Sequence, residues 1–200
     1  MATNTGEYMI PQRTTGPDTG PVMVQMFALS SVGMTRDHNE DAYLVANLSG
    51  GEALRFDRLL EQSGDSRGTL FMVADGMGGA AAGEIASATA VDVVLRHLRE
   101  ELSGRESVTA GEFVGAVNRA AEIANWSIFH YAAGHPELRG MGTTATMAAL
   151  LGDKLYLAQV GDSRAYMVRE GVAYQLTKDQ SLMQKLIEAG ELTAEEAAMS

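Results

Sequence analysis

The sequence predicts an α+β domain, with an antiparallel β-sheet core and helices packed outside it. Strand-like segments come first along the chain, a pair of amphipathic helices follows, and further strand-like segments come after the helices. The later strands are joined by tight turns, which leave room only for antiparallel neighbours. A parallel doubly wound sheet needs regular strand–helix alternation, which this order lacks. At 200 residues, 46% of them hydrophobic, the chain is long enough for one domain with a sizeable core.

The first part of the chain is predicted to form a tail and then two strands. Residues 1–22 are polar and rich in Thr, Gly and Pro, so we expect a disordered or flexible tail before a domain that spans 23–200. Strand-like patterns follow at 22–33 and at 41–48. The stretch 49–68 contains several glycines and is expected to be an excursion before the third strand.

A third predicted strand, at 69–74, precedes two predicted helices. The first helix is expected around 84–102, where apolar residues recur at spacings of three and four. The second begins at Thr109, which has capping-box spacing with Glu112, and ends at Gly134. The apolar residues expected on the buried faces are Ile85, Ala88, Val91, Leu95, Leu98 and Leu102 in the first helix and Val114, Val117, Ala121, Ala124, Ile128 and Tyr131 in the second.

The segment 143–176 predicts four strands in a meander. Gly152–Asp153 and Glu170–Gly171 are its clearest turn signals. Connections this short place consecutive strands side by side in antiparallel fashion.

Two further capping boxes predict helices near the end of the sequence. Ser181 and Gln184 form the first box, and Gly190 is expected to end its helix. Thr193 and Glu196 form the second.

Charge and composition exclude several classes of function. The formal net charge is −11, whereas nucleic acids and anionic membranes attract basic surfaces. We therefore expect neither a nucleic-acid partner nor a membrane partner. No apolar run is long enough to cross a bilayer, and the N-terminus lacks the order of a signal peptide. Because there is no cysteine, disulfides and thiolate chemistry are excluded, and a cytoplasmic location is the default expectation.

Acidic residues stand at the ends of predicted strands in three places. Glu40 and Asp41 begin the second strand, Asp75 follows the third, and Asp162 follows the segment KLYLAQVG. Neighbouring antiparallel strands can end at one rim of a sheet, where converging carboxylates raise one another's pKa values unless a cation binds them. Oxygen ligands without thiolates favour a hard ion such as Mg²⁺, Mn²⁺ or Ca²⁺.

The alternative is that each aspartate only caps a turn. For an isolated Asp–Gly pair that explanation is the commoner one, and it suits Asp153. Three clusters in equivalent positions favour the metal site instead. The small residues that follow Asp75, beginning with Gly76, would let backbone carbonyls and water molecules approach an ion closely.

Arg36 stands four residues before Glu40, and two roles are equally consistent with that spacing. A guanidinium beside a metal cluster can bind phosphate through paired hydrogen bonds. It can also form an ordinary salt bridge with a neighbouring carboxylate. Arg164 is expected to be structural, and His38 is the one histidine near the acidic cluster.

Five motifs, in their order and spacing, resemble those of one enzyme family. They are TRDHNEDAY, FMVADGMGGAAAGEIAS, GMGTTATMAAL, LYLAQVGDSRAYMVREG and LTKDQSLMQKLIEAGELTAEEA. On these motifs the chain is similar to the metal-dependent protein serine/threonine phosphatases, the type 2C or PPM family, and the form DGMGG resembles its bacterial branch. The resemblance extends from about Val24 to the last residue.

This resemblance implies a fold and a mechanism. The fold would be an antiparallel β-sandwich flanked by helix pairs, in four layers ordered α-β-β-α. Two Mn²⁺ or Mg²⁺ ions would activate a water that attacks phosphoserine or phosphothreonine in line, without a phosphoenzyme intermediate. Phosphorylated proteins, the products of serine/threonine kinases, would be the substrates, and we expect a monomer.

The family's metal ligands correspond to acidic positions of this chain. Asp75 resembles the carboxylate that bridges both ions. Glu40 and the backbone carbonyl of Gly76 resemble ligands of the second ion, partly through water. Asp41 resembles an acidic residue that supports these ligands, and Asp162 resembles a ligand of a weaker third ion.

Arg36 resembles the family's phosphate clamp, but two departures from the family pattern bear on activity. Some members carry a histidine, proposed as the general acid, where Met77 stands here; methionine cannot donate a proton, and His38 is a weak substitute. The family pattern also continues beyond Ser200 with two aspartates, in DG and DN motifs, that ligate the first ion. We therefore expect a C-terminally incomplete domain, with weak metal binding and little turnover by these residues alone.

A Mn²⁺- or Mg²⁺-dependent protein serine/threonine phosphatase is therefore the leading hypothesis. The alternative is a non-catalytic regulatory or phospho-binding module derived from the same fold, although the intact acidic residues weigh against it. A metal-dependent nuclease fits a carboxylate cluster but conflicts with the acidic surface. Neither a P-loop nor a serine-hydrolase elbow is present in the sequence.

Overall fold

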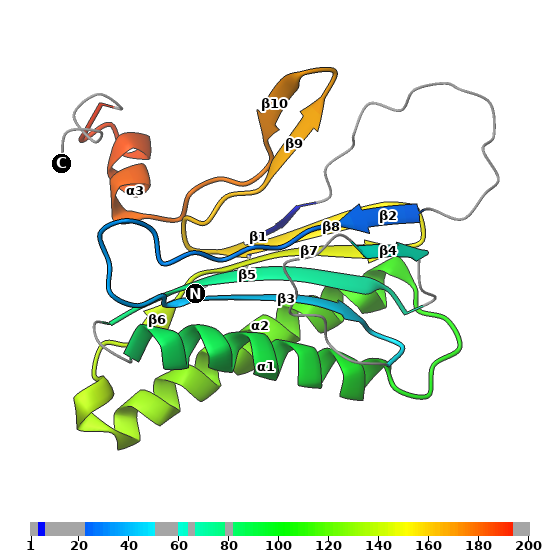
Figure 1. Cartoon of the computed structure of the whole chain (residues 1–200), viewed down its shortest axis with the longest axis horizontal. Coiled ribbons are helices and arrows are strands. Elements are labelled where there is room, and N and C mark those ends of the chain that lie inside the picture. Colours follow the sequence, from blue (N-terminus) through cyan, green and yellow to red (C-terminus); the bar gives the residue numbers. More distant parts are fainter. Residues whose placement is uncertain (1–3, 7–22, 51–59, 64–66, 79–81, 194–200) are drawn as a thin grey trace.

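A six-stranded antiparallel sheet forms the centre of the fold, and a pair of helices covers one of its faces (Figure 1). The computed structural model describes residues 4–6, 23–50, 60–63, 67–78 and 82–193. The strands run in the order β1–β8–β7–β5–β3, and β6 pairs with the far end of β5. They are β1 (Asn4–Gly6), β3 (Asp41–Asn47), β5 (Thr69–Met77), β6 (Gly142–Thr143), β7 (Ala145–Leu151) and β8 (Lys154–Val160).

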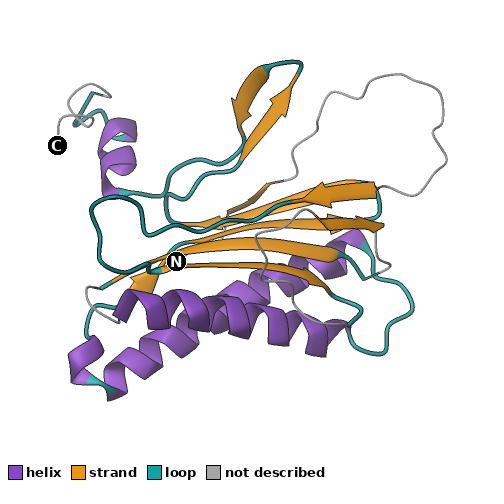
Figure 2. Cartoon of the chain, viewed as in Figure 1, coloured by secondary structure: helices purple, strands orange, loops and turns teal. Residues whose placement is uncertain are grey.

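The two long helices, α1 (Ala82–Leu102) and α2 (Ala110–Gly134), pack on each other and on this sheet (Figure 2). Alternation along β5 turns Leu70, Met72 and Ala74 towards the helices, where they are buried. The α+β class with antiparallel strands is therefore confirmed. Within the described residues α1 and α2 are the helix pair that flanks the sheet; the second pair of the expected four-layer arrangement is not among them.

The buried faces of the helices differ in part from the predicted ones. In α1 three predicted residues are only half-buried, namely Ile85, Ala88 and Leu95. Ala86 and Val94, which were not predicted, are fully buried. The reason is that α1 contacts both the sheet and α2, so its buried arc is wider than one amphipathic stripe. In α2 the prediction for Tyr131 is wrong: this residue is 44% exposed, because the buried face of the helix ends at Ile128.

The first predicted strand is shorter in the structure and has an unforeseen partner. Of the described part of the predicted 22–33 strand, residues 23–33, only β2 (Met23–Met26) forms a strand. It pairs with β4 (Leu60–Ser63), a strand inside the predicted excursion 49–68, and the two form a separate small sheet. The sequence LEQS of β4 lacks the apolar alternation of a core strand, so the pattern did not predict it.

The predicted meander is only partly correct. Strands β7 and β8 form the expected hairpin, and β9 (Tyr166–Arg169) pairs with β10 (Val172–Gln175) across the predicted turn, where Glu170 has φ 53°. However, β9 and β10 make a two-stranded sheet of their own and project away from the central sheet (Figure 1). The chain leaves the central sheet at Gly161, whose positive φ of 98° ends β8.

The first predicted C-terminal helix is present as α3 (Leu182–Glu188). Ser181 caps it by accepting a hydrogen bond from the Gln184 N–H at 3.1 Å, and Gly190 follows with φ 73°. The predicted box at Thr193 and Glu196 ends outside the described residues. No helix in the described part of the chain is long and apolar enough to span a membrane.

The predicted tail at 1–22 lies mostly outside the described residues. Its Asn4–Gly6 segment pairs antiparallel with β8 as the edge strand β1.

Thr109→Ala is expected to lower the free energy of unfolding by about 1 kcal/mol. Both halves of the predicted capping box are present: the Thr109 hydroxyl accepts from the Glu112 N–H, and a Glu112 carboxylate oxygen accepts from the Thr109 N–H at 3.0 Å. Urea denaturation measures the change, with Ser107→Ala, an exposed residue outside the helix, as the control. A loss no larger than that of the control would show that the cap does not stabilise α2.

Candidate functional site

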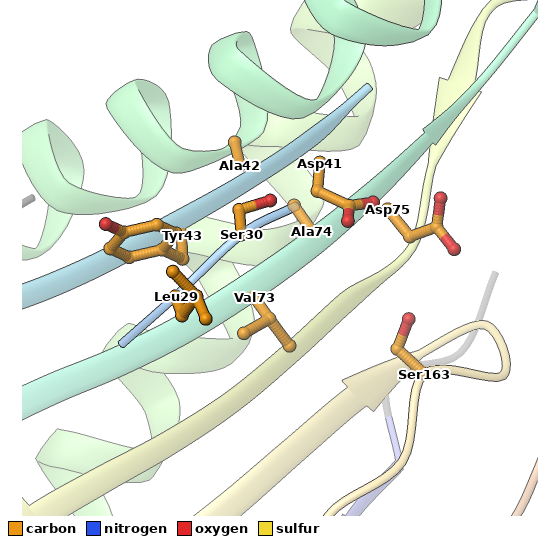
Figure 3. Close-up of a pocket in the computed structure, with 9 residues that line it drawn as sticks. All are labelled: Leu29, Ser30, Asp41, Ala42, Tyr43, Val73, Ala74, Asp75 and Ser163. Atoms are coloured by element: carbon orange, nitrogen blue, oxygen red, sulfur yellow. The ribbon is translucent and has the colours of Figure 1, made fainter. Parts of the chain in front are cut away.

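Asp41 and Asp75 lie opposite each other on neighbouring strands of the central sheet. The register of β3 and β5 pairs these two residues directly. Facing residues of an antiparallel pair place their side chains on the same side of the sheet, with Cβ atoms about 5 Å apart. Figure 3 shows both carboxylates at this edge, with Ser163 on the loop that faces them. The expected convergence of acidic strand ends is therefore present for this pair.

Burial and neighbouring charges raise the pKa of the Asp75 carboxyl above its usual 3.8. Partial burial is the largest cause, and the charge of Asp41 is the next. The charge of Asp162 acts in the same direction, and the Arg36 guanidinium opposes it. Asp41, Asp162 and Arg36 are therefore all close enough to act on the Asp75 carboxyl. A bound cation would relieve the repulsion among the carboxylates.

The Glu40 side chain is held beside the N-terminus of α1. It is 12% exposed, and its Oε1 is buried without a hydrogen-bond partner. A Cβ atom placed on Gly83 would lie 2.7 Å from this oxygen. Helix N-termini favour negative charge, but an unsatisfied buried acceptor costs about 1–3 kcal/mol. Glu40 therefore offers a desolvated carboxylate oxygen that a ligand could satisfy.

The small residues after Asp75 allow β5 and α1 to approach each other very closely. A Cβ atom on Gly76 would lie 2.1 Å from the carbonyl oxygen of Gly83 and 2.7 Å from that of Glu40. The Gly76 N–H donates to the Glu40 carbonyl at 3.2 Å, and the Ser87 hydroxyl donates to the same oxygen at 2.6 Å. Only glycine fits at position 76. Its close contacts join the end of β5 to the start of α1 and to Glu40.

Arg36 lies next to Glu40, as its spacing predicted. The distance from its Nη1 to Glu40 Oε2 is 3.8 Å, and the Arg36 side chain is 68% exposed. A long ion pair at an exposed position is weak, so it leaves the guanidinium available to an incoming anion. The two predicted roles are thus compatible.

Asp162 is exposed on the loop after β8, and a group of hydroxyls holds this loop against Asp75. The Asp75 N–H donates to Thr144 Oγ1 at 3.0 Å, and this oxygen lies 2.7 Å from Ser163 Oγ. The Thr146 hydroxyl donates to the Ser163 carbonyl at 2.7 Å. The sequence analysis missed these residues; the only available signal was the run of threonines before β7.

The carboxylates border an open pocket of about 230 Å³. Its lining combines Asp41, Asp75, Ser30 and Ser163 with apolar side chains such as Leu29 and Val73 (Figure 3). Among the described residues, no three acidic or histidine side chains come close enough together to hold an ion by themselves. The site therefore has the right donor chemistry for a hard cation, but the described side chains supply only part of a ligand set.

Three other residues singled out from the sequence, Arg164, His38 and Met77, do not belong to the acidic pair. Arg164 binds Asp179 through two hydrogen bonds, of 2.8 and 2.6 Å, so its role is structural as expected. These bonds also lower the pKa of the Asp179 carboxyl. His38 is exposed. Met77 is 62% exposed and cannot take part in proton transfer.

Comparison with protein families gives a match to protein phosphatase 2C over residues 49–196. This region includes Asp75, Gly76 and Asp162, whereas Arg36 and Glu40 precede it. The chain is 39% identical over 128 residues to the serine/threonine protein phosphatase PstP of Mycobacterium tuberculosis, covering 64% of this chain and 24% of the relative. It is 34% identical over 165 residues to the serine/threonine phosphatase stp of Listeria monocytogenes, covering 82% and 58%.

Solved structures show the same similarity. The serine/threonine phosphatase of S. agalactiae superposes with a TM-score of 0.71 at 31% identity, over 90% of this chain and 65% of that one. The catalytic domain of PstP in complex with two manganese ions gives a TM-score of 0.63 at 33% identity, over 88% and 65%. The chain thus spans less than two thirds of the length of these relatives. With the family match over most of its residues, it belongs to the protein phosphatase 2C family.

Proposed function

We propose that this protein hydrolyses phosphoserine and phosphothreonine in other proteins with the help of divalent cations. Proteins phosphorylated by serine/threonine kinases are the corresponding substrates. The family membership supports the reaction class. Its location is supported by the group of Glu40, Asp41 and Asp75, which we call the acidic edge. The observation that carries the proposal is the facing pair Asp41 and Asp75, with a raised pKa on Asp75, beside the unsatisfied oxygen of Glu40.

The residues at this edge have distinct roles in the proposed reaction. Asp75, Glu40 and the carbonyl of Gly76 would hold two Mn²⁺ or Mg²⁺ ions, Asp41 would support them, and Asp162 would hold a weaker third. When bound, such ions supply an activated water and neutralise charge on the phosphoryl group. The water oxygen would bond to phosphorus as the bond from phosphorus to the serine or threonine oxygen breaks. The water loses one proton, and the leaving serine or threonine oxygen gains one. Little covalent work remains for the protein.

Turnover by these 200 residues alone is proposed to be weak. The described side chains form no complete ligand group, and incomplete coordination lowers metal affinity. Phosphopeptide hydrolysis should be measured with Mn²⁺, before and after a chelator, beside the S. agalactiae relative under the same conditions. We expect slow, chelator-sensitive hydrolysis. Hydrolysis that persists in chelator would contradict the proposal.

The incomplete ligand group also supports an alternative, a non-catalytic module that binds phosphorylated proteins. Fluorescence titration with a labelled phosphopeptide and its unphosphorylated form separates the two functions. Phosphate-dependent binding in Mn²⁺ without any release of phosphate would favour the module. Release of phosphate would favour the enzyme.

Arg36→Ala is expected to raise the KM for a phosphopeptide by about tenfold, with a smaller effect on kcat. Hydrogen bonds to charged groups contribute about 1.5–3 kcal/mol, and Arg36 is exposed enough to meet the phosphate. Arg36→Lys should recover only part of the loss, because lysine lacks the paired donors. Arg139→Ala, an exposed arginine outside the site, is the control. A KM for Arg36→Ala equal to that of the control would remove Arg36 from the site.

A further inference from the structure

A second cavity, of about 210 Å³, lies between the helix pair and the central sheet. Buried alanines of both helices, including Ala90 and Ala124, leave the space open, and buried Met72 forms part of its wall. It has no lining residue in common with the acidic pocket. Apolar cavities of about 150 Å³ can stay dry and take up benzene, so this one is large enough for a molecule with a single ring.

The lining favours an aromatic ring over an aliphatic one. Three methionines, Met72, Met77 and Met141, line the cavity together with Phe129. Thioether sulfur makes favourable contacts with aromatic rings, worth about 0.3–1.5 kcal/mol each. Methionine is also flexible enough to adjust to an entering ligand.

An exposed group of rings continues from the cavity over the surface of α2. Phe129 is 68% exposed and meets His130 edge to face, with ring centroids 5.5 Å apart. His130 in turn stacks on Trp126 at 3.9 Å. These contacts hold Phe129, a residue that also lines the cavity, within an exposed group of rings on α2.

The polar groups of the lining restrict the ligand further. The described residues that line the cavity include no charged side chain, so a neutral molecule fits best. The Thr143 hydroxyl already donates to the Asp75 carbonyl at 3.0 Å. Asn125, at an exposed position of α2, is then the side chain suited to a single polar substituent.

We propose that this cavity binds a small neutral aromatic molecule of the phenol class, with one ring and one polar group. The ring occupies the space between the alanines and the thioethers, and the polar group faces Asn125. The site goes beyond the proposed phosphatase reaction and is tested without metal or substrate, so the two can fail separately.

The test is a titration of the protein, labelled at its methionine methyl groups, with phenol and with cyclohexanol, which has nearly the same size. Phenol should shift the methyl signals of Met72, Met77 and Met141 saturably, and leave those of exposed Met23 and Met34 in place. Phenol should bind roughly threefold or more tightly than cyclohexanol, as one sulfur–ring contact suffices for that ratio.

Two variants of α2 provide the matched comparison. Ala124→Leu fills the cavity and should abolish the saturable shifts of the lining methionines, whereas Ala133→Leu, at an exposed position of the same helix, should preserve them. Phenol binding that survives in Ala124→Leu, equal affinity for cyclohexanol, or no saturable shift at these methionines in the unmodified protein would each overturn the proposal. The titration of the unmodified protein tests the proposal even if Ala124→Leu does not fold, because it does not depend on that variant.

Discussion

Asp75→Asn is expected to reduce phosphopeptide hydrolysis about a thousandfold while making the folded protein more stable at neutral pH. Stabilisation of transition-state charge by bound ions is worth several kcal/mol, and each 1.4 kcal/mol is a factor of ten in rate. Asparagine keeps the shape of the side chain but not the charge that would bridge the ions. Mn²⁺ affinity, measured by titration, should fall together with the rate.

The gain in stability follows from the direction of the Asp75 pKa shift. Its pKa is raised in the folded state, so folding penalises the charged form, and the penalty is present once the pH exceeds the folded pKa. As the pH falls towards 3.8 the carboxyl is protonated in the folded protein and the penalty disappears. The thermal midpoint of Asp75→Asn should therefore exceed that of the unmodified protein at pH 7, and the difference should shrink at about pH 4.

Asp153→Asn is the matched control for Asp75→Asn. Asp153 is exposed in the turn between β7 and β8, away from the acidic edge, so the same substitution there should alter neither rate nor metal affinity. If Asp75→Asn kept full metal-dependent activity, Asp75 could not be a ligand. A stability difference that did not change with pH would show that the Asp75 charge does not oppose folding.

Gly76→Ala is expected to lower the free energy of unfolding by about 3 kcal/mol or more and to disrupt the acidic edge. The added methyl group would lie 2.1 Å from the Gly83 carbonyl oxygen, which belongs to the backbone of α1. Backbone atoms cannot rotate out of the way, so the start of α1 must shift, and overpacking of this kind costs about 1–3 kcal/mol or more. Because Glu40 lies against Gly83, its carboxylate should move as well.

Gly111→Ala provides the comparison for this second substitution. Gly111 lies in the first turn of α2, and a Cβ atom there would meet nothing within 4 Å. The same change at that position should be neutral or stabilising by about 0.4–1 kcal/mol. Urea denaturation gives both values, and a Gly76→Ala variant as stable as Gly111→Ala would show that the close approach of β5 and α1 is not required.

The features that were predictable from the sequence depend on local patterns. The capping residues Thr109 and Ser181 were predictable because a cap is defined within four residues. The meeting of Asp41 with Asp75 was predictable because both residues adjoin clear apolar strands, and strand ends share an edge of the sheet. The register that places them opposite each other required the structure.

The features that were not predictable depend on contacts between distant segments. Strand β4 exists because β2 pairs with it, and its own residues give no sign of that. The Thr144 and Ser163 hydroxyls lie 2.7 Å apart, although 19 positions separate them in the chain. A threonine at the start of a strand is too common to indicate that it supports a neighbouring carboxylate.

The direct pairing of Asp41 with Asp75 makes the site sensitive to the length of β3. Side chains alternate between the two faces of a sheet, so a slip of one position reverses every one of them. Deleting one residue between Asp41 and Asn47 would force a choice between the acidic edge and the buried residues Leu44 and Ala46. Insertions between β2 and β3, or between β3 and β5, leave this pairing unchanged, and homologous proteins should vary in length there instead.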